Sequence, residues 1–110
     1  MIEALIREHL ASQLGVPVFL EQKVRQGKYV VFEKVGGSRS NYLSSSIFAF
    51  QSYGDSLFQA SELNEAVKEA LDSLVALPEV AFVRYNSDSN FTDTSIKKYR
   101  YQAVYEIKHY

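Results

Sequence analysis

The sequence predicts an α+β fold in which two helices pack on a mostly antiparallel sheet, with the element order α-β-β-β-α-β-β. One observation is a long amphipathic stretch in the middle of the chain, residues 56–77. Another is a set of short stretches in which apolar and polar residues alternate, the pattern of strands with one buried face. Since 110 residues are enough for one hydrophobic core, a single domain over residues 1–110 is expected.

The central stretch has the sequence of a helix that lies on a sheet. Its apolar residues recur at steps of three and four, which places them along one side of a helix. Ser56 and Gln59 have the spacing of a capping box at the helix start, and Pro78 ends the helix because it has no N–H. A short coiled coil is the alternative, although three heptads are its minimum. The side chains expected to be buried against the sheet are Leu63, Val67, Leu71 and Leu74.

The first half of the chain contains one further helix and three strands. Residues 1–14 have helical periodicity, and Gly15 follows as a C-terminal cap. Residues 16–22 include a proline and suit an edge strand. Alternating residues then predict strands over residues 29–35 and 42–53. Between them, the glycine- and serine-rich residues 36–41 are expected to form a flexible hairpin loop, and a phosphate-binding loop is the less favoured alternative because a strand follows it.

The last third of the chain predicts two strands joined by a polar loop. Residues 80–85 alternate in the manner of a strand, and residues 86–95 are short and polar, as in loops. Residues 97–110 form a long final strand whose alternate positions are rich in tyrosine. The tyrosines that share one face of this strand are Tyr99, Tyr101 and Tyr105.

Composition and charge exclude several classes of protein. The formal net charge is −1, which lacks the basic character of a dedicated nucleic-acid binder. With no cysteine there is neither a disulfide nor a thiolate metal site. No run approaches 18 consecutive apolar residues and no signal-peptide pattern opens the sequence, so we expect a protein made in a cytosol. Eight tyrosines and seven phenylalanines are the exception in an ordinary composition, and aromatic residues are common at interfaces.

No catalytic, cofactor-binding or metal-binding residues are identified, so we do not expect an enzyme. His9 and His109 lie at opposite ends of the chain, and neither has the spacing of a metal ligand. Asp88 and Asp93 share a polar loop, but the glycine and the final glutamate of a calcium-binding loop are missing. The three serines at 44–46 are not in the setting of a catalytic nucleophile.

Three stretches together resemble a known family. They are YVVFEKVGGSRSNY at 29–42, FAFQSYGDSLFQASELNEAVKEALDSLVAL at 48–77 and NFTDTSIKKYRYQAVYEIKH at 90–109. This pattern is similar to the small tail-terminator, or tail-completion and head–tail joining, proteins of long non-contractile-tailed phages and of prophages in Gram-positive bacteria. The resemblance covers nearly the whole chain and includes no catalytic signature.

The resemblance implies a structural role in the virion, after assembly in the host cytoplasm. Proteins of this family form hexameric rings that stop polymerisation of the tail tube and offer a surface to the head connector, while DNA passes through the lumen without specific binding. The implied partners are therefore other copies of the chain, the tail-tube protein and the connector protein, with no membrane. A ring needs two different patches on each subunit. The candidate contact residues are Arg39, Ser40, Asn41, Tyr99, Tyr101 and Tyr105.

Two alternatives stay open at this point. The tyrosines of the last strand are equally well explained as a cover over a helix in the core of the monomer. The chain as a whole is alternatively a small cytosolic α+β module, a dimer that binds or senses a ligand between sheet and helix. Such a module would need a concave apolar pocket, which the sequence alone does not reveal.

Overall fold

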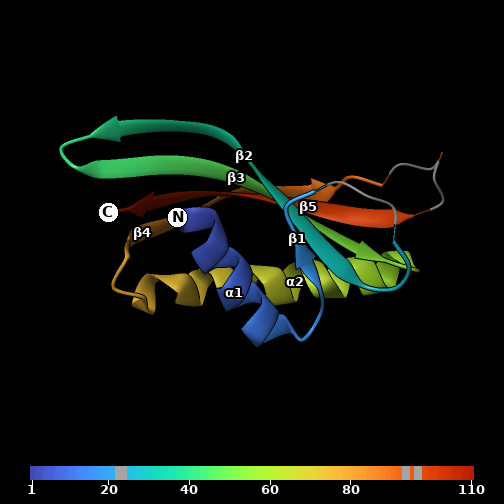
Figure 1. Cartoon of the computed structure of the whole chain (residues 1–110). Coiled ribbons are helices and arrows are strands. Elements are labelled where there is room, and N and C mark those ends of the chain that lie inside the picture. The colour runs from blue at the N-terminus through green and yellow to red at the C-terminus, as the bar shows by residue number, and fades with distance from the viewer. Residues whose placement is uncertain (22–24, 93–94, 96–97) are drawn as a thin grey trace.

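A computed structural model describes residues 1–21, 25–92, 95 and 98–110 of the chain. Two helices lie on one face of a five-stranded sheet (Figure 1). The strand order is β1-β2-β3-β5-β4, and every neighbouring pair is antiparallel except β1 and β2. The elements are α1 (Ile2–Leu14), β1 (Val18–Phe19), β2 (Tyr29–Ser40), β3 (Leu43–Gly54), α2 (Leu57–Asp72), a 3₁₀ turn (Ser73–Ala76), β4 (Val80–Asn90) and β5 (Tyr99–His109). The predicted α+β fold and element order are confirmed.

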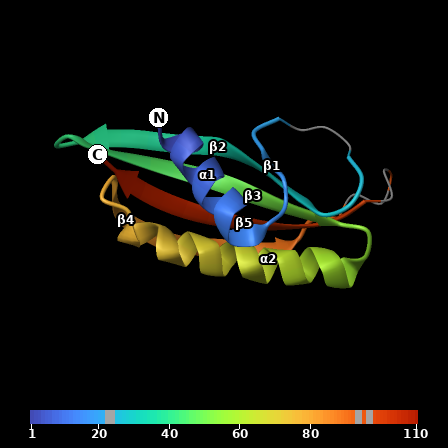
Figure 2. The ribbon, with the colours of Figure 1, turned by 60° about the horizontal axis from the view of Figure 1, so that its bottom comes forward.

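The hydrophobic core lies between the sheet and the two helices. Figure 2 shows α2 running along the sheet and α1 crossing beside it. The strands contribute alternate residues, as their sequence pattern predicts, because side chains of a strand point to opposite faces in turn. The strand residues of this core include Val30, Phe32, Phe48, Phe50, Ala103, Tyr105 and Ile107. The expected helix residues Leu63, Val67, Leu71 and Leu74 are all buried in it.

The start of α2 follows the predicted capping arrangement in part. The hydroxyl of Ser56 accepts a hydrogen bond of 3.1 Å from the backbone N–H of Gln59. The side chain of Gln59 reaches back to the backbone N–H of Asp55, at 3.0 Å, rather than to that of Ser56. The α-helix ends at Asp72, and the remaining predicted turn, Ser73–Ala76, has 3₁₀ geometry. The start of the central helix is therefore where the sequence predicts it, whereas the α-helix ends before the predicted stop at Pro78.

Gly54 is where β3 passes closest to the first turn of α2. A Cβ atom at this position would lie 2.7 Å from the backbone nitrogen of Ala60 and 2.8 Å from Cβ of Gln59. We expect Gly54→Ala to reduce the unfolding free energy by about 1–3 kcal/mol, because the helix would have to move away from the sheet. Chemical denaturation of the two proteins measures this, and Gly36→Ala, where the nearest atom is 3.7 Å away, is the control that should change little.

The predicted hairpin loop at residues 36–41 is wrong, because the two strands continue through most of it. β2 extends to Ser40 and pairs with β3 down to the pair Ser40–Leu43. A bulge interrupts the register between Lys34 and Gly36, and residues 36–40 are mostly exposed. Sequence patterns miss such a segment because neither of its faces is apolar. We call the paired residues 36–47 the arm.

The predicted polar loop at residues 86–95 is also wrong in its first half. β4 continues to Asn90, and its partner at that end is Tyr101 of β5. A second bulge between Tyr85 and Ser87 accompanies the change from apolar to polar sequence. Residue Asp93 and the predicted start of the last strand at Lys97 lie outside the described residues. Of the predicted first strand at 16–22, the pairing covers Val18–Phe19.

Candidate functional site: two ends of an elongated sheet

Three of the six candidate contact residues lie at the tip of the arm. Arg39 and Ser40 end β2, and Asn41 begins the turn to β3. Asn41 and Tyr42 both have positive φ, 51° and 68°, so the strands are joined by a two-residue turn of the kind that matches the twist of a hairpin. The side chain of Tyr42 is 90% exposed. The tip therefore holds an aromatic ring out into solvent.

The conformation of Tyr42 is unfavourable for its residue type. Asparagine tolerates the left-handed region, and glycine is the usual residue after it in this turn. A residue with a Cβ atom pays roughly 1–2 kcal/mol there. Backbone strain of this kind is concentrated at functional sites, because a stability cost is tolerated where the side chain is needed. The predicted loop ends at Asn41 and does not include Tyr42. A tyrosine after Asn41, where this turn usually has glycine, was the sequence signal that could have identified it.

The other three candidates lie on β5 and differ in exposure. Tyr99 pairs with Gly54 and is 40% exposed, while Tyr101 pairs with Ser52 and is partly buried. Tyr105 is fully buried, and its ring packs edge-on against Phe50. Burial raises the pKa of the Tyr105 hydroxyl, which bonds toward α2. Tyr105 therefore belongs to the core of the monomer, which was the alternative explanation of these tyrosines. Of the three, Tyr99 is the most exposed.

The tip of the arm and Tyr99 are at opposite ends of the molecule, and Tyr101 and Tyr105 lie between them along β5. Along the same pair of strands, Tyr99 faces Gly54 at one end and His109 faces Ser44, beside the arm, at the other. The chain is elongated, with extents of 44 × 24 × 21 Å (Figure 1). The structure therefore does not bring the candidates together in one site. It gives each chain two different patches, one at each end of its long axis.

Two residues that sequence analysis did not select enlarge the patch near Tyr99. Leu57 and Phe58 open α2, three and four residues after Gly54, which is the partner of Tyr99. Both side chains are exposed, and Phe58 is 73% exposed. Phe58 could have been selected from the sequence, because it is an aromatic residue outside the apolar stripe of the helix. We call Leu57, Phe58 and Tyr99 the aromatic end.

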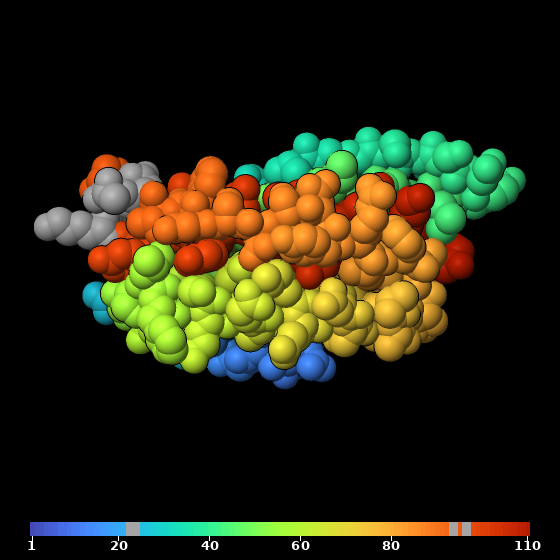
Figure 3. Space-filling view, turned by 180° about the vertical axis from the view of Figure 1, so that it is seen from behind, coloured from blue at the N-terminus to red at the C-terminus, as the bar shows by residue number. Residues whose placement is uncertain are grey.

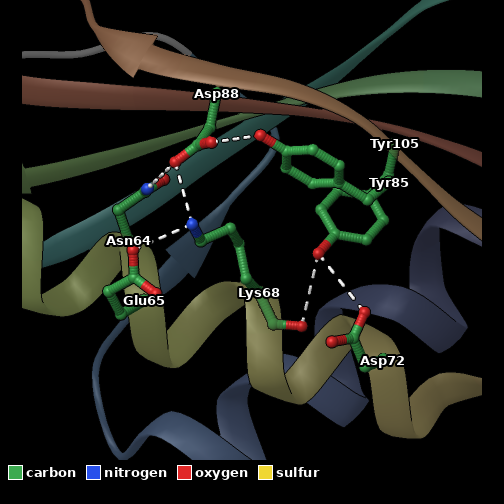
Figure 4. Close-up of polar contacts among 7 residues, drawn as sticks. All are labelled: Asn64, Glu65, Lys68, Asp72, Tyr85, Asp88 and Tyr105. Carbon is green, nitrogen blue, oxygen red and sulfur yellow. Dashed lines mark hydrogen bonds and ion pairs between the residues drawn. The ribbon is translucent and has the colours of Figure 1, made fainter.

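A polar cluster joins β4 to α2 on the helix side of the sheet (Figure 4). Asp88 accepts hydrogen bonds from the amide of Asn64 at 2.8 Å, from the ammonium of Lys68 at 3.0 Å and from the hydroxyl of Tyr85. Lys68 also forms an ion pair with Glu65 at 2.8 Å. These bonds favour the carboxylate form, so the pKa of Asp88 is lowered, with the Tyr85 bond as the largest cause. The cluster holds the polar half of β4 against the helix.

The Asp88 cluster predicts a dependence of stability on acid. In the folded chain the pKa of Asp88 is below its ordinary value of 3.8. The stabilisation that the Asp88 carboxylate provides is therefore fully present above pH 3.8 and is lost as the pH falls through the folded pKa. We expect Asp88→Asn to lower the unfolding free energy at neutral pH, and this difference from the wild type should shrink below pH about 4. Denaturant titrations across pH 2–7 measure the difference, and a constant difference would contradict the assignment.

The surface hollows offer little for a small ligand. One hollow of about 310 Å³ lies beside the arm, and its walls are mostly polar. They are formed by Ser38, Ser40, Asn41, Leu43, Ser45, Glu106 and Lys108. Over the described part of the chain, no group of three histidine or acidic side chains is placed to hold a metal ion. In the same residues, no helix is long and apolar enough to cross a membrane.

The fold is similar to that of a chain in a solved gene transfer agent particle. A chain of the solved structure described as the virion of a native gene transfer agent (GTA) particle superposes with a TM-score of 0.67. The match covers 94% of this chain and 90% of that chain, at 16% sequence identity. No protein-family model matches the sequence, and no curated protein matches it. At this identity the likeness establishes a shared fold over nearly the full length of both chains.

Proposed function

We propose that this chain is a structural protein of a phage tail, a tail terminator that forms a six-membered ring on the end of the tail tube. The ring stops growth of the tube and presents a surface to the head connector. The observation that carries the proposal is the full-length likeness in fold to a chain of a gene transfer agent virion. The resemblance in sequence pattern to tail terminators supports the same role.

The distribution of the two patches supports ring formation. Closed rings arise from heterologous contacts, in which one patch of a subunit meets a different patch of its neighbour. The arm and the aromatic end are different in composition and lie at opposite ends of the chain, as such contacts require. The near-neutral net charge also suits a ring around DNA, because each additional phosphate contact would add salt-dependent affinity.

A ring that is stable only on the tube suits this role. A terminator caps an existing polymer and does not compete with it during growth, so the contacts between free subunits are expected to be weak.

Binding to tail tubes tests the proposal. Purified protein is added to growing tubes assembled from the cognate tail-tube protein, and the tubes are examined by electron microscopy. The expected result is a ring of six chains, about 75 kDa in total from chains of 12.5 kDa, at one end of each tube, with growth arrested. Tubes that lengthen equally with and without the protein would refute the terminator. A stable dimer that binds a small ligand would favour the regulatory module instead.

A further inference from the structure

We propose that the tip of the arm of one copy docks on the aromatic end of the next copy, with Tyr42 as the central contact and Arg39 paired with Asp55. This contact specifies the subunit interface of the proposed ring and so rests on that function for its biological setting. The contact itself is a property of the purified chain. It can be measured without any tail component.

The donor side of the contact is the tip of the arm. Tyr42 is almost fully exposed and is kept in a conformation that favours glycine. Rigid aromatic side chains with few rotatable bonds make effective anchors at interfaces, because they bury a large area at a small entropy cost. The backbone behind the ring is a paired hairpin rather than a loop, so the anchor is held at a defined distance from the body of the subunit.

The acceptor side is the surface formed by Leu57, Phe58 and Tyr99. All three side chains are at least 40% exposed. They come from two elements that the pairing of Gly54 with Tyr99 brings together. This pairing is the basis for treating the three side chains as one surface, and an exposed apolar surface marks a contact site more often than single exposed residues do. An aromatic surface of this kind is suited to stacking against a tyrosine ring.

The charges of the two segments are complementary. Residues 36–43 of the arm carry one charge, the exposed cation Arg39. Residues 54–62, which contain Leu57 and Phe58, carry the two carboxylates Asp55 and Glu62 and no cation. The Asp55 side chain is 63% exposed even though one oxygen bonds to Lys98. Opposite charges orient two surfaces during encounter and oppose contact between two copies of the same patch.

The position of the two surfaces makes the contact directional. Because they lie at opposite ends of the 44 Å axis, an arm cannot reach the aromatic end of its own chain. Figure 3 shows the arm projecting at one end of the molecule, away from the start of α2 at the other. Each copy therefore uses its arm with one neighbour and its aromatic end with another, which is the arrangement that a closed ring requires.

Engineered cysteines give a direct test, because the chain has none of its own. Ser40→Cys, beside the tip of the arm, and Ser61→Cys, one turn after Leu57 and Phe58 on α2, leave the contact rings in place. The two variants are prepared separately, mixed and oxidised, and the products are followed by non-reducing electrophoresis and mass spectrometry. The expected product is the mixed disulfide between positions 40 and 61, formed at least about tenfold faster than either homodimer because the contact holds the thiols together. The double variant should form a ladder of covalent oligomers that ends in a closed ring.

The control is Glu8→Cys, at an exposed position on the outer side of α1, which should show no preference for either partner. The contact would be overturned if homodimers formed as fast as the mixed disulfide. It would also be overturned if the control cysteine reacted with either partner as fast as the two partners react with each other. If the mixed disulfide fails to form while the protein still caps tail tubes, the contact is wrong and the proposed function stands. If the mixed disulfide forms but the protein does not cap tail tubes, the contact stands and the terminator function is wrong.

Further substitutions distinguish an anchor from a structural residue. Tyr42→Gly should raise the denaturation midpoint, because glycine relieves the positive φ, and should still abolish the preference of a cysteine at position 40 for one at position 61. A lower denaturation midpoint for Tyr42→Gly would show that the backbone of Tyr42 is not strained. Arg39→Gln on one partner and Asp55→Asn on the other should each slow the mixed disulfide, and combining them should slow it little further. Losses that add in the combined experiment would remove the ion pair from the contact. Charge reversal at Asp55 is avoided because its carboxylate also pairs with the buried Lys98 at 2.8 Å.

Discussion

Leu71→Ala is expected to reduce the unfolding free energy by about 2–5 kcal/mol. Leu71 is completely buried where α2 meets the sheet, so truncation leaves a cavity that the surrounding strands fill only in part. A domain of this size is stable by roughly 5–15 kcal/mol, so the change removes a large share of the total. Equilibrium denaturation with urea, followed by far-UV circular dichroism, measures it.

Val75→Ala is the matched control for this prediction. Val75 lies four residues further along in the 3₁₀ turn and is exposed, so its truncation should change the unfolding free energy by less than about 0.5 kcal/mol. A loss of less than about 0.5 kcal/mol for Leu71→Ala would show that the central helix does not carry the core. Equal losses at the two positions would show that the effect does not depend on burial, since helix propensity favours alanine at both.

Shortening the arm is expected to abolish assembly while leaving the fold intact. The variant removes the two outermost cross-strand pairs, Arg39–Ser44 and Ser40–Leu43, and carries Tyr42→Gly in the retained turn. Removing two residues from each strand keeps the register and the facing of every remaining side chain. Losing an aromatic anchor and a charged partner should weaken each subunit contact by about 2–4 kcal/mol, or roughly 30- to 700-fold.

Infectious titre of a phage that carries the shortened arm measures this effect, beside the denaturation midpoint of the purified variant. A large fall in titre with an unchanged or higher midpoint is the expected pair of results, because the removed residues are exposed and the new turn is less strained. Normal titre would show that the arm is not a contact. A lower midpoint would instead attribute the loss to folding.

The fold was predictable because its core follows simple periodicities. The stripe of Leu63, Val67 and Leu71 on α2, and the alternation of Phe48 and Phe50 on β3, are both read directly from spacing. The start of α2 was predictable from Ser56, but its end was not, because the α-helix stops at Asp72 and the 3₁₀ turn Ser73–Ala76 follows before Pro78. Each of the predictable features is local, so no knowledge of distant contacts was needed.

The ends of the strands were not predictable, because they depend on pairing rather than on burial. Residues 36–40 and 86–90 are polar and read as loops, yet β3 and β5 continue beside them and provide hydrogen-bonding partners. Lys98 is a similar case. Its charge suggests an exposed side chain, but it is buried and donates hydrogen bonds to the carbonyl of Gly27 and to Asp55, which are distant in sequence.

The candidate site was predictable in its parts but not in its arrangement. Aromatic surplus and a glycine-flanked Arg39 indicated contact residues, but spacing could not show that Tyr99 and the arm lie at opposite ends of the sheet. Nor could it separate Tyr99 from the buried Tyr105, since both occupy the same face of one strand. The difference in burial between Tyr99 and Tyr105 depends on where α2 begins and on how much of the sheet the helices cover.

Electron microscopy of a lysate from a phage with this gene deleted tests the central claim most directly. The account predicts that heads and unjoined or overlong tails accumulate separately, because no ring stops the tube or offers a surface to the connector. Supplying the wild-type protein from a plasmid should restore joined particles. Normal infectious particles from the complete deletion would contradict the terminator role outright, and the ligand-binding module would then become the leading hypothesis.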